Sequence, residues 1–506
     1  MKSTEERVLR KSLLALSVAA VVVVAAFAAY EAYLPSGQNT PCVAVQGSAP
    51  VRTQTAKMNL GGVTEYKLPG VDRWPNAVTN ASDGTVWFAE QAVPGVGHLY
   101  PSNGTVVEYP WPDYPAPLPP DCIPSVSSTG IAIWQGRVWA SDQFGSLIQG
   151  VNPRDGAVVT LNVTAKAPNP YWLAVGPDGY LWFTSYNIPP APGALGRVAP
   201  NMTVEAVKLL GLGAYEPLQI EFVNSTLAYI ATINLSTNST THSCNCDGHI
   251  YSFDPASVTS EVTPTLVGGN FRIVEPTSVT YSDGAVWVTQ HDASSIQMYN
   301  LTAMTWTTYP TSVVPWLSVT LPYVVEAANG NIWFNEHYAN KIALLNPASG
   351  TLTEYSESDP PASNYSEIQN DESISLGDGG LWFTSMSGNY VGFVNESYTP
   401  GFGVAVSGTN RAAVVAGGNA SFSLVITGSR PVPMNVSVSD SESHTSIPAA
   451  IRVAPSVSTV PAGSSPYSLG VNVDVGSSVP PGRYTVLVTV TDGLTQESSY
   501  VFVTVT

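Results

Sequence analysis

Seven carboxylate, amide and imidazole side chains occupy equivalent places in the sequence. Each lies at, or directly after, the end of a short apolar segment that contains tryptophan. They are Glu90, Asp142, Gln290, His291, Asp292, Glu336 and His337. Oxygen atoms of carboxylates and amides bind calcium and magnesium, and imidazole widens the choice of divalent metals. If the fold brings these segments together, the sequence predicts a ligand site with magnesium or calcium as the candidate cofactor. The alternative is that these residues are solvated ends of strands.

The cysteines form a second group with chemistry of its own, and they are Cys42, Cys122, Cys244 and Cys246. Four cysteines allow three disulfide pairings. We favour Cys42 with Cys122 and Cys244 with Cys246, although so small a ring as the second would be strained. The segment from His242 to His249 also suggests metal binding, but its cysteine spacing differs from the usual Cys-x-x-Cys pattern. Disulfides are therefore the preferred interpretation.

The tryptophan segments belong to an internal repeat. Six copies contain tryptophan and a degenerate copy contains tyrosine; they span residues 86–90, 138–142, 181–185, 227–232, 286–290, 332–336 and 381–385. Neighbouring copies are separated by roughly 43 to 58 residues, a period typical of propeller blades with four strands each. An Asp-Gly or Asn-Gly pair precedes most copies, as at Asp83-Gly84 and Asn329-Gly330, and such pairs indicate tight hairpins. We therefore predict a seven-bladed β-propeller.

The two ends of the repeat complement each other. The seventh unit lacks a fourth strand after residues 390–395, whereas residues 63–68 precede the first unit and match the Val-Glu-Tyr pattern of residues 106–110. Pairing of the early segment with the last unit would close the ring and remove exposed strand edges. We expect the propeller to span residues 61–398, with its N-terminal strand closing the ring.

The repeats resemble those of the virginiamycin B lyase family of streptogramin lyases and of the wider group of NHL-type propellers. The likeness is carried by residues 332–342, Ile-Trp-Phe-Asn-Glu-His-Tyr-Ala-Asn-Lys-Ile, and by Thr353-Glu354-Tyr355. These are similar to the W-F-T-E-x-x-x-N-K-I-G and T-E-Y elements of the family. The resemblance covers about 335 residues and implies the propeller fold rather than one activity.

The resemblance also implies where an active site of this family would lie. Its lyases open a cyclic depsipeptide by elimination, with a histidine base in a Pro-His-Gly-like strand start and a magnesium-binding glutamate after a tryptophan strand. Glu90 and Glu336 match that glutamate. The comparable strand starts carry no histidine; they read Pro75-Asn76, Tyr171-Trp172, Pro217-Leu218, Pro276-Thr277 and Pro322-Tyr323. Because proton abstraction requires a positioned base, an enzyme is the less favoured class, and no catalytic residue is assigned.

Antiparallel pairing places the start of each first strand beside the end of the tryptophan strand that follows it. The seven polar residues named above should therefore surround one mouth of the central channel. This position is the predicted ligand site.

The N-terminus indicates a membrane protein. Apolar residues fill positions 13–34 and follow a segment, residues 1–12, that contains Lys2, Arg7, Arg10 and Lys11. An apolar stretch of this length spans a bilayer, and its basic flank stays in the cytoplasm. We predict a single-pass signal anchor, a linker over residues 35–60 and an extracellular remainder. The alternative is a cleaved signal peptide, since Ala26-Phe27-Ala28 offers small residues at the right spacing.

Composition agrees with export and disfavours nucleic acid as a partner. The 506 residues include 37 Asp and Glu against 19 Lys and Arg, with a net charge of -18, so few cations are present to neutralise phosphates. Glycosylation triplets of the form Asn-x-Ser/Thr are spread over the region after the apolar segment. They begin at Asn80, Asn103, Asn162, Asn201, Asn224, Asn234, Asn238, Asn300, Asn364, Asn395, Asn419 and Asn435.

The pattern changes after residue 400. Tryptophan is absent there, and alternating apolar and polar residues predict a series of short strands over residues 401–506. About a hundred residues with this patterning suit an immunoglobulin-like β-sandwich. Residues 480–486, Pro-Pro-Gly-Arg-Tyr-Thr-Val, resemble an element common in surface modules of this kind. The predicted fold class is all-β: a propeller followed by an Ig-like sandwich, with one N-terminal transmembrane helix.

Three functions fit these observations. The favoured one is a membrane-anchored, glycosylated extracellular binding or scaffold protein, whose partners are other surface proteins or glycans. The second is a metal-dependent lyase-like or lactonase-like enzyme that uses Glu90, Glu336 and His337. The third is an accessory subunit of a membrane complex or surface lattice. The sequence contains no legible nucleotide-binding loop or nucleophile triad.

Overall fold

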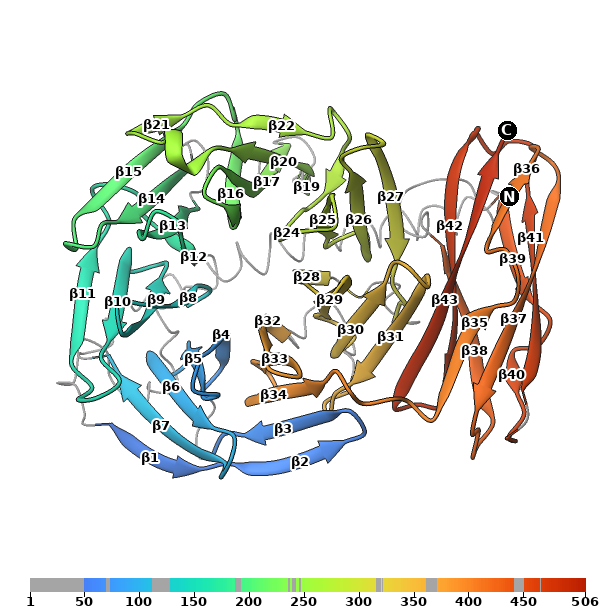
Figure 1. Ribbon diagram of the computed structural model, residues 1–506, viewed down its shortest axis with the longest axis horizontal. Coiled ribbons are helices and arrows are strands. Elements are labelled where there is room, and N and C mark those ends of the chain that lie inside the picture. Colours follow the sequence, from blue (N-terminus) through green and yellow to red (C-terminus); the bar gives the residue numbers. More distant parts are fainter. Residues whose placement is uncertain are drawn as a thin grey trace, which may run out of the picture.

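The computed structural model describes residues 50–69, 73–111, 128–186, 193–234, 237–238, 243–244, 247–314, 320, 322–360, 371–440, 450–464 and 466–506. Strands dominate these residues, and the one helical element among them is the short 3-10 turn η1 (Pro255–Ser257). Seven sheets surround a central axis, and a further pair of sheets lies beside them (Figure 1). The predicted β-propeller is therefore confirmed.

Each of the first three blades has four antiparallel strands that follow one another from the axis outward. Blade one contains β4 (Pro75–Asn80), β5 (Val86–Glu90), β6 (Gly95–Tyr100) and β7 (Thr105–Pro110), with β1 (Val51–Gln54) added outside β7. Blade two contains β8 (Ile131–Trp134), β9 (Arg137–Asp142), β10 (Leu147–Val151) and β11 (Val158–Asn162). Blade three contains β12 (Pro170–Val175), β13 (Leu181–Ser185), β14 (Ala194–Val198) and β15 (Val204–Leu209), with β21 (Glu261–Val262) parallel to β15.

Blades four to six repeat this plan. Blade four contains β16 (Tyr215–Asn224), β17 (Leu227–Asn234), β20 (Asp247–Phe253) and β22 (Thr265–Val267), and β23 (Ile273–Val274) also pairs with β20. The small hairpin of β18 (Thr237–Asn238) and β19 (Ser243–Cys244) lies between β17 and β20 in sequence. Blade five contains β24 (Val279–Ser282), β25 (Ala285–Gln290), β26 (Ser295–Asn300) and β27 (Thr305–Pro310). Blade six contains β28 (Pro322–Ala328), β29 (Asn331–Glu336), β30 (Lys341–Asn346) and β31 (Thr351–Ser356).

Blade seven is completed by the N-terminal part of the chain, as predicted. Its strands β32 (Asp371–Gly377), β33 (Gly380–Ser385) and β34 (Tyr390–Asn395) are joined by β3 (Val63–Lys67), which pairs antiparallel with β34 so that Val63 lies opposite Val394. β2 (Ala56–Leu60) adds a further strand outside β3. Residues 51–60, which the sequence analysis assigned to a linker, thus form β1 and β2, because the outer edges of β7 and β3 offer them unpaired backbone groups.

The Asp-Gly and Asn-Gly turns fold as predicted. At Asp283-Gly284 and at Asn329-Gly330 both residues have positive φ angles, between 50° and 75°. This is the backbone of a type I′ turn, whose twist matches the flanking strands. The turns set the register that brings polar residues to the ends of β25 and β29.

The tryptophan strands supply the packing between blades. The tryptophans are buried, with exposed fractions from 0% for Trp139 and Trp182 to 8% for Trp382. Trp139 packs against Leu181 and Phe183 of blade three, and Trp382 packs against Val86 and Phe88 of blade one. Adjacent blades therefore bury apolar surface against each other, and these contacts stabilise the ring around the axis.

The C-terminal residues form a two-sheet sandwich. One sheet has the order β35 (Phe402–Val406), β37 (Asn419–Gly428), β41 (Tyr467–Val475) and β39 (Ile451–Pro455). The other has the order β40 (Thr459–Val460), β38 (Met434–Asp440), β42 (Gly482–Thr491) and β43 (Thr495–Val505), with β36 (Arg411–Val414) parallel to β43. Leu424, Val471, Val488 and Val503 belong to the apolar core between the sheets, which agrees with the alternating sequence pattern.

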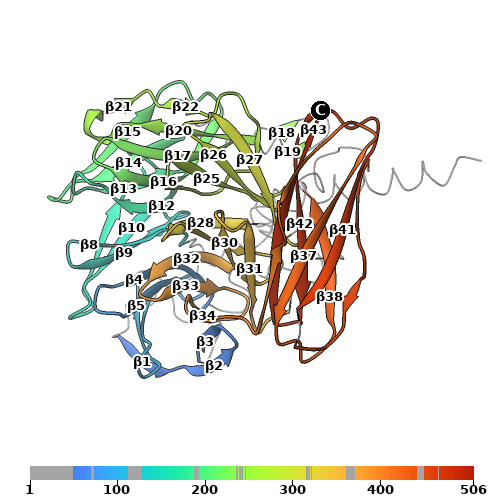
Figure 2. The ribbon, with the colours of Figure 1, turned by 45° about the vertical axis from the view of Figure 1, so that its right-hand side comes forward.

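The sandwich and the propeller share one continuous sheet. β43 pairs antiparallel with β31, the outer strand of blade six, from Thr351 opposite Ser499 to Tyr355 opposite Thr495. The buried Tyr500 hydroxyl donates to the carbonyl oxygen of Pro310 at 2.9 Å, and its ring lies 5.2 Å from that of Tyr309. Figure 2 shows the sandwich standing along the edge formed by β27 and β31. The two parts are therefore joined by backbone pairing as well as by side chains.

Several predictions lie outside the described residues: the cytoplasmic segment, the membrane segment of residues 13–34, Cys42, Cys122, Cys246 and Asn364. Cys244 belongs to β19, but its side chain is not described. In the part of the chain that is described, no helix is long and apolar enough to cross a bilayer.

Candidate functional site

The structure divides six of the seven predicted site residues into two groups and places the seventh, Asp142, apart from both. Glu90 and Glu336 are buried inside blades one and six, each beside the glutamate of a Glu-Tyr pair on the outer strand of the same blade. His291, Asp292 and His337 lie together where blades five and six meet, with Gln290 beside them. Asp142 is in blade two, and its carboxylate accepts from the backbone N–H of Gly145 at 2.9 Å.

The buried glutamate pairs are alike in both blades. Burial, followed by the nearby Glu108 carboxylate, raises the pKa of Glu90, and Arg73 opposes this shift. Arg73 binds Glu108 at 2.8 Å. In blade six, burial and the charge of Glu354 raise the pKa of Glu336. A proton held by the inner glutamate relieves the repulsion between the two carboxyl groups.

The outer glutamates also connect neighbouring blades. Glu354 accepts from Ser312, which lies between blades five and six, and Lys341 lies 3.6 Å from the Glu354 carboxylate. Glu65 of β3 accepts from the backbone N–H of Ser358 at 2.7 Å and from its hydroxyl at 2.6 Å. The Thr-Glu-Tyr motif thus has a structural role at the joints between blades.

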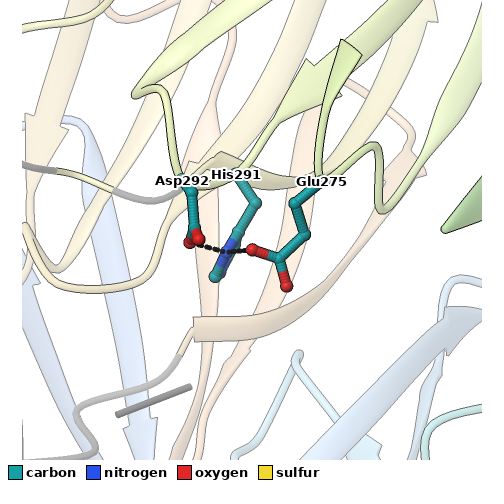
Figure 3. A group of neighbouring side chains, drawn as sticks. All are labelled: Glu275, His291 and Asp292. Atoms are coloured by element: carbon teal, nitrogen blue, oxygen red, sulfur yellow. Dashed lines mark hydrogen bonds and ion pairs between the residues drawn. The ribbon is translucent and has the colours of Figure 1, made fainter. Parts of the chain in front are cut away.

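The central feature of the second group is His291, which directly follows β25. Its Nδ1 lies 3.1 Å from a carboxylate oxygen of Glu275 and 3.1 Å from one of Asp292. Figure 3 shows the imidazole between these two carboxylates. The three residues offer ligand atoms that all lie within 4.8 Å of one another. We call Glu275, His291, Asp292, His337 and Tyr323 the mouth cluster.

Backbone contacts bring Glu275 into this cluster. The N–H of His291 donates to the carbonyl oxygen of Glu275 at 3.2 Å, and the Gln290 side chain accepts from the N–H of Val274 at 3.1 Å. Glu275 has a φ angle of 49°, an uncommon backbone conformation for a non-glycine residue and one often found at ligand sites. Gln290, predicted as a ligand, instead positions the segment that carries Glu275.

Blade six contributes two rings to the mouth cluster. The ring of His337 lies 5.4 Å from that of His291, in an edge-to-face arrangement, and 4.3 Å from the ring of Tyr323. His337 is 6% exposed, and its Nε2 has no hydrogen-bond partner among the described residues. An acceptor left in this state can take a proton or a metal ion.

Tyr323 also contacts blade three. Its hydroxyl is in hydrogen-bond contact with the hydroxyl of Tyr171 on β12. Both tyrosines occupy register shifts in their first strands, between Pro170 and Leu173 and between Pro322 and Val325. Such bulges re-aim side chains. The Thr277 and Thr129 hydroxyls donate to the carbonyl oxygens of Tyr323 and Tyr171 at 2.5 Å and 2.8 Å, respectively.

Electrostatics make the two histidines different. Burial disfavours the imidazolium of His291, but the carboxylates of Glu275 and Asp292 outweigh it and raise the pKa of His291 to about 10. Burial and the charge of His291 lower the pKa of His337 well below its ordinary value. Burial and the charge of Asp292 raise the pKa of Glu275 to about 8, with His291 opposing. At neutral pH a charged His291 therefore stands beside a neutral His337.

This donor set fits a divalent metal ion. Two carboxylates and two imidazoles are common ligands of zinc, manganese and iron, whereas calcium and magnesium prefer oxygen alone. The Nε2 of His337, which has no hydrogen-bond partner among the described residues, is a further donor for such an ion. Glu275, His291 and Asp292 would hold such an ion, with His337 completing the set. Binding would displace the proton of His291.

Sequence reasoning missed Glu275, Tyr171 and Tyr323. Glu275 precedes Pro276, which lies just before β24, and Tyr323 follows Pro322, the first residue of β28, so both flank a proline near the beginning of a first strand. The family resemblance implies only a histidine at such strand starts. Antiparallel pairing places the start of each first strand beside the end of its tryptophan strand. Polar residues at the strand starts, such as Glu275 and Tyr323, could therefore have been predicted as site residues by the same rule.

Comparisons with known proteins give structural neighbours but no family. No family model matches the chain, and no curated protein matches it. Virginiamycin B lyase from Staphylococcus aureus is 19% identical over 66% of this chain and 98% of its own, with a TM-score of 0.47. A streptogramin B lyase is 19% identical over 66% of this chain and 97% of its own, with a TM-score of 0.46. BamB from Moraxella catarrhalis is 14% identical over 71% of this chain and 99% of its own, with a TM-score of 0.36.

Proposed function

We propose that this chain is a membrane-anchored extracellular binding protein whose propeller binds its ligand at the channel mouth through a divalent metal ion. The observation that carries the proposal is the convergence of Glu275, His291 and Asp292 beside the Nε2 of His337, which has no hydrogen-bond partner in the described part of the chain. The anchor of residues 13–34, glycosylation at the Asn-x-Ser/Thr triplets and disulfide bonding of the cysteines belong to the same proposal. Its partners would be other surface proteins or glycans.

The C-terminal sandwich supports a role in display. Its strand order, β35-β37-β41-β39 against β40-β38-β42-β43, agrees with that of an immunoglobulin-like domain and supports this assignment. We therefore assign residues 401–506 as an Ig-like module. Because β43 pairs with β31, the module would hold the propeller at a fixed orientation relative to the surface.

Calorimetric titration of the full chain with Zn²⁺, Mn²⁺, Mg²⁺ and Ca²⁺ tests the proposed site. We expect saturable binding of Zn²⁺ or Mn²⁺, weakened at least tenfold in Glu275→Gln and lost in the double variant His291→Ala/His337→Ala. Glu261→Gln changes an exposed glutamate on β21 and is the matched control. A flat trace for the wild-type chain with Zn²⁺ and Mn²⁺ would refute the metal site.

A metal-dependent enzyme is the second candidate, and one observation favours it. The neutral His337, with its unpartnered Nε2, is a possible general base, and Glu275, with its raised pKa, is a possible acid. Incubation of the full chain with a streptogramin B substrate and with simple lactones separates the candidates. Sustained turnover that a chelator abolishes would support an enzyme, whereas metal binding without turnover would support the binding protein.

A further inference from the structure

The axis of the propeller holds a cavity that is distinct from the mouth cluster. Its volume is about 180 Å³, and its walls come from the inner strands of every blade except blade five, together with residues directly before β8. Most of its polar lining offers oxygen atoms: Thr79, Thr129, Gln219, Ser373 and Ser375, together with Glu221 and Glu326. We call this space the axial cavity.

Two carboxylates dominate the charge of the axial cavity. Glu221 lies on β16 and Glu326 on β28, both are partly buried, and each lines the cavity. Among the described residues neither carboxylate has a hydrogen-bond or ion-pair partner. The lining contains no lysine, arginine or histidine. Two carboxyl groups therefore face the same small space, and no cationic side chain is among the residues that line it.

The chemistry of these walls selects a cation with oxygen ligands. Calcium takes six to eight oxygen ligands in flexible geometry and accepts carboxylates, amide oxygens and water together. Magnesium is smaller, needs a stricter octahedral shell and releases its water reluctantly. A water molecule occupies about 30 Å³ in the liquid, so the cavity has room for an ion that keeps several water ligands.

The axial cavity is separated from the mouth cluster. Glu326 follows Tyr323 by three residues on β28, which corresponds to about 10 Å along an extended strand. None of the five mouth-cluster residues is among the residues that line the axial cavity, and Trp172, which follows Tyr171, is the nearest lining residue in sequence to the tyrosine contact. A ligand in one site is therefore not a ligand of the other.

We propose that the axial cavity binds one calcium ion through the carboxylates of Glu221 and Glu326, with hydroxyl groups and water as further ligands. The site is independent of the proposed function at the mouth. Electrostatics agree with it: burial raises the pKa of Glu221 to about 7, and burial together with the charge of Glu221 raises the pKa of Glu326 to about 8. A bound dication would remove this mutual repulsion.

Terbium luminescence tests the site in the full chain. Tb³⁺ replaces Ca²⁺ at oxygen sites and is sensitised by a nearby tryptophan, and Trp172 lies in the cavity wall. We expect tryptophan-sensitised emission that saturates with Tb³⁺ and is displaced by Ca²⁺ at lower concentration than by Mg²⁺. Glu221→Gln and Glu326→Gln should each weaken binding at least tenfold, and the double variant should abolish it.

The controls separate this site from the mouth and from loss of folding. Glu261→Gln should bind Tb³⁺ like the wild-type chain, and so should Glu275→Gln, because it alters only the mouth cluster. Melting temperatures with and without Ca²⁺ identify a variant that is folded but no longer stabilised by the ion. Emission unchanged in the folded double variant, or displacement by tetramethylammonium rather than Ca²⁺, would overturn the proposal.

Discussion

The hydroxyl groups of Tyr171 and Tyr323 are in hydrogen-bond contact although the two residues belong to blades three and six. These blades are not neighbours, so the contact crosses the central channel. Each tyrosine occupies a register shift of its first strand, and the bulge directs its side chain toward the axis. The two bulges therefore bring blades three and six into contact across the axis.

Removing one hydroxyl from this contact should have a small, measurable effect. We expect Tyr171→Phe to lower the free energy of unfolding by about 1 kcal/mol, the usual net contribution of a neutral hydrogen bond. In a double-mutant cycle with Tyr323→Phe, measured by urea unfolding, the effects should be less than additive. Strict additivity would show that the hydroxyls do not interact.

Loss of the Glu65 carboxylate should weaken the closure of the ring. It accepts two hydrogen bonds from Ser358 and is fully buried. We expect Glu65→Ala to destabilise the chain by about 3 kcal/mol, because the partly buried N–H and hydroxyl of Ser358 both lose a charged acceptor. Glu205→Ala, which removes a half-exposed ion pair with Arg197, should cost less than about 1 kcal/mol. Equal effects on the unfolding free energy would contradict the role of Glu65.

The junction between propeller and sandwich depends in part on Tyr500. Its buried hydroxyl donates to Pro310, so Tyr500→Phe should reduce stability by about 1 kcal/mol. Tyr281→Phe is the control, since Tyr281 is half-buried and its hydroxyl has no hydrogen-bond partner among the described residues. Scanning calorimetry should show the propeller and sandwich transitions move apart in Tyr500→Phe only.

His98 should make the chain sensitive to acid. Its ring stacks on Trp87 at 3.7 Å, neither of its nitrogens has a partner in the described part of the chain, and burial lowers its pKa to about 4. The unfolded chain binds the proton more readily, so stability falls as the pH drops from about 6.5 toward 4, by at most about 3 kcal/mol. His98→Phe keeps the stacking and should flatten this part of the pH profile, followed by urea unfolding. An unchanged profile would exclude His98 as its cause.

Metal binding at the mouth should release a proton. Burial lowers the pKa of His291, but the carboxylates of Glu275 and Asp292 outweigh burial and raise that pKa to about 10. His291 is therefore protonated at pH 7.5. A metal ion must displace that proton, and affinity should rise with pH. Titrations in two buffers of different ionisation enthalpy measure the release. Binding without proton release would show that His291 is not a ligand.

The repeats made the propeller predictable. Each tryptophan strand is buried against the next blade, and this packing is local enough to leave a clear period in the sequence. The closure of the ring by β3 was predictable because the seventh repeat has no fourth strand of its own, whereas residues 63–68 carry the sequence pattern of a fourth strand. The pairing of β43 with β31 was not, since it joins two outer strands whose sequences carry no signal for each other.

The site was predictable only in part. His291, Asp292 and His337 were found because polar residues follow tryptophan strands, and the same rule selected Glu90 and Glu336, whose side chains face an outer strand instead. The side of a strand on which a residue lies depends on register, which spacing alone leaves open. Glu275 reaches the cluster through a backbone conformation with positive φ.

Many Asn-x-Ser/Thr triplets have a structural explanation as well. The side-chain oxygens of Asn103, Asn162 and Asn201 accept from the backbone N–H two residues later. This is the Asx turn, which favours asparagine at tight turns. The triplets therefore recur with the hairpins, and their number reflects the repeat. Asn103, Asn162 and Asn201 are also exposed, so their role in the turns is compatible with the proposed glycosylation.

The ladder between β31 and β43 has a mechanical consequence. Blade six, which carries Tyr323 and His337, is the one blade whose outer strand is extended by the sandwich. Tilting of that blade at the mouth must swing the sandwich with it, because a hydrogen-bonded sheet resists shear between its strands. The sandwich thus acts as a lever arm, since β43 continues over residues 500–505, about 20 Å, beyond its pairing with β31, and a label at its far end would amplify movements of blade six.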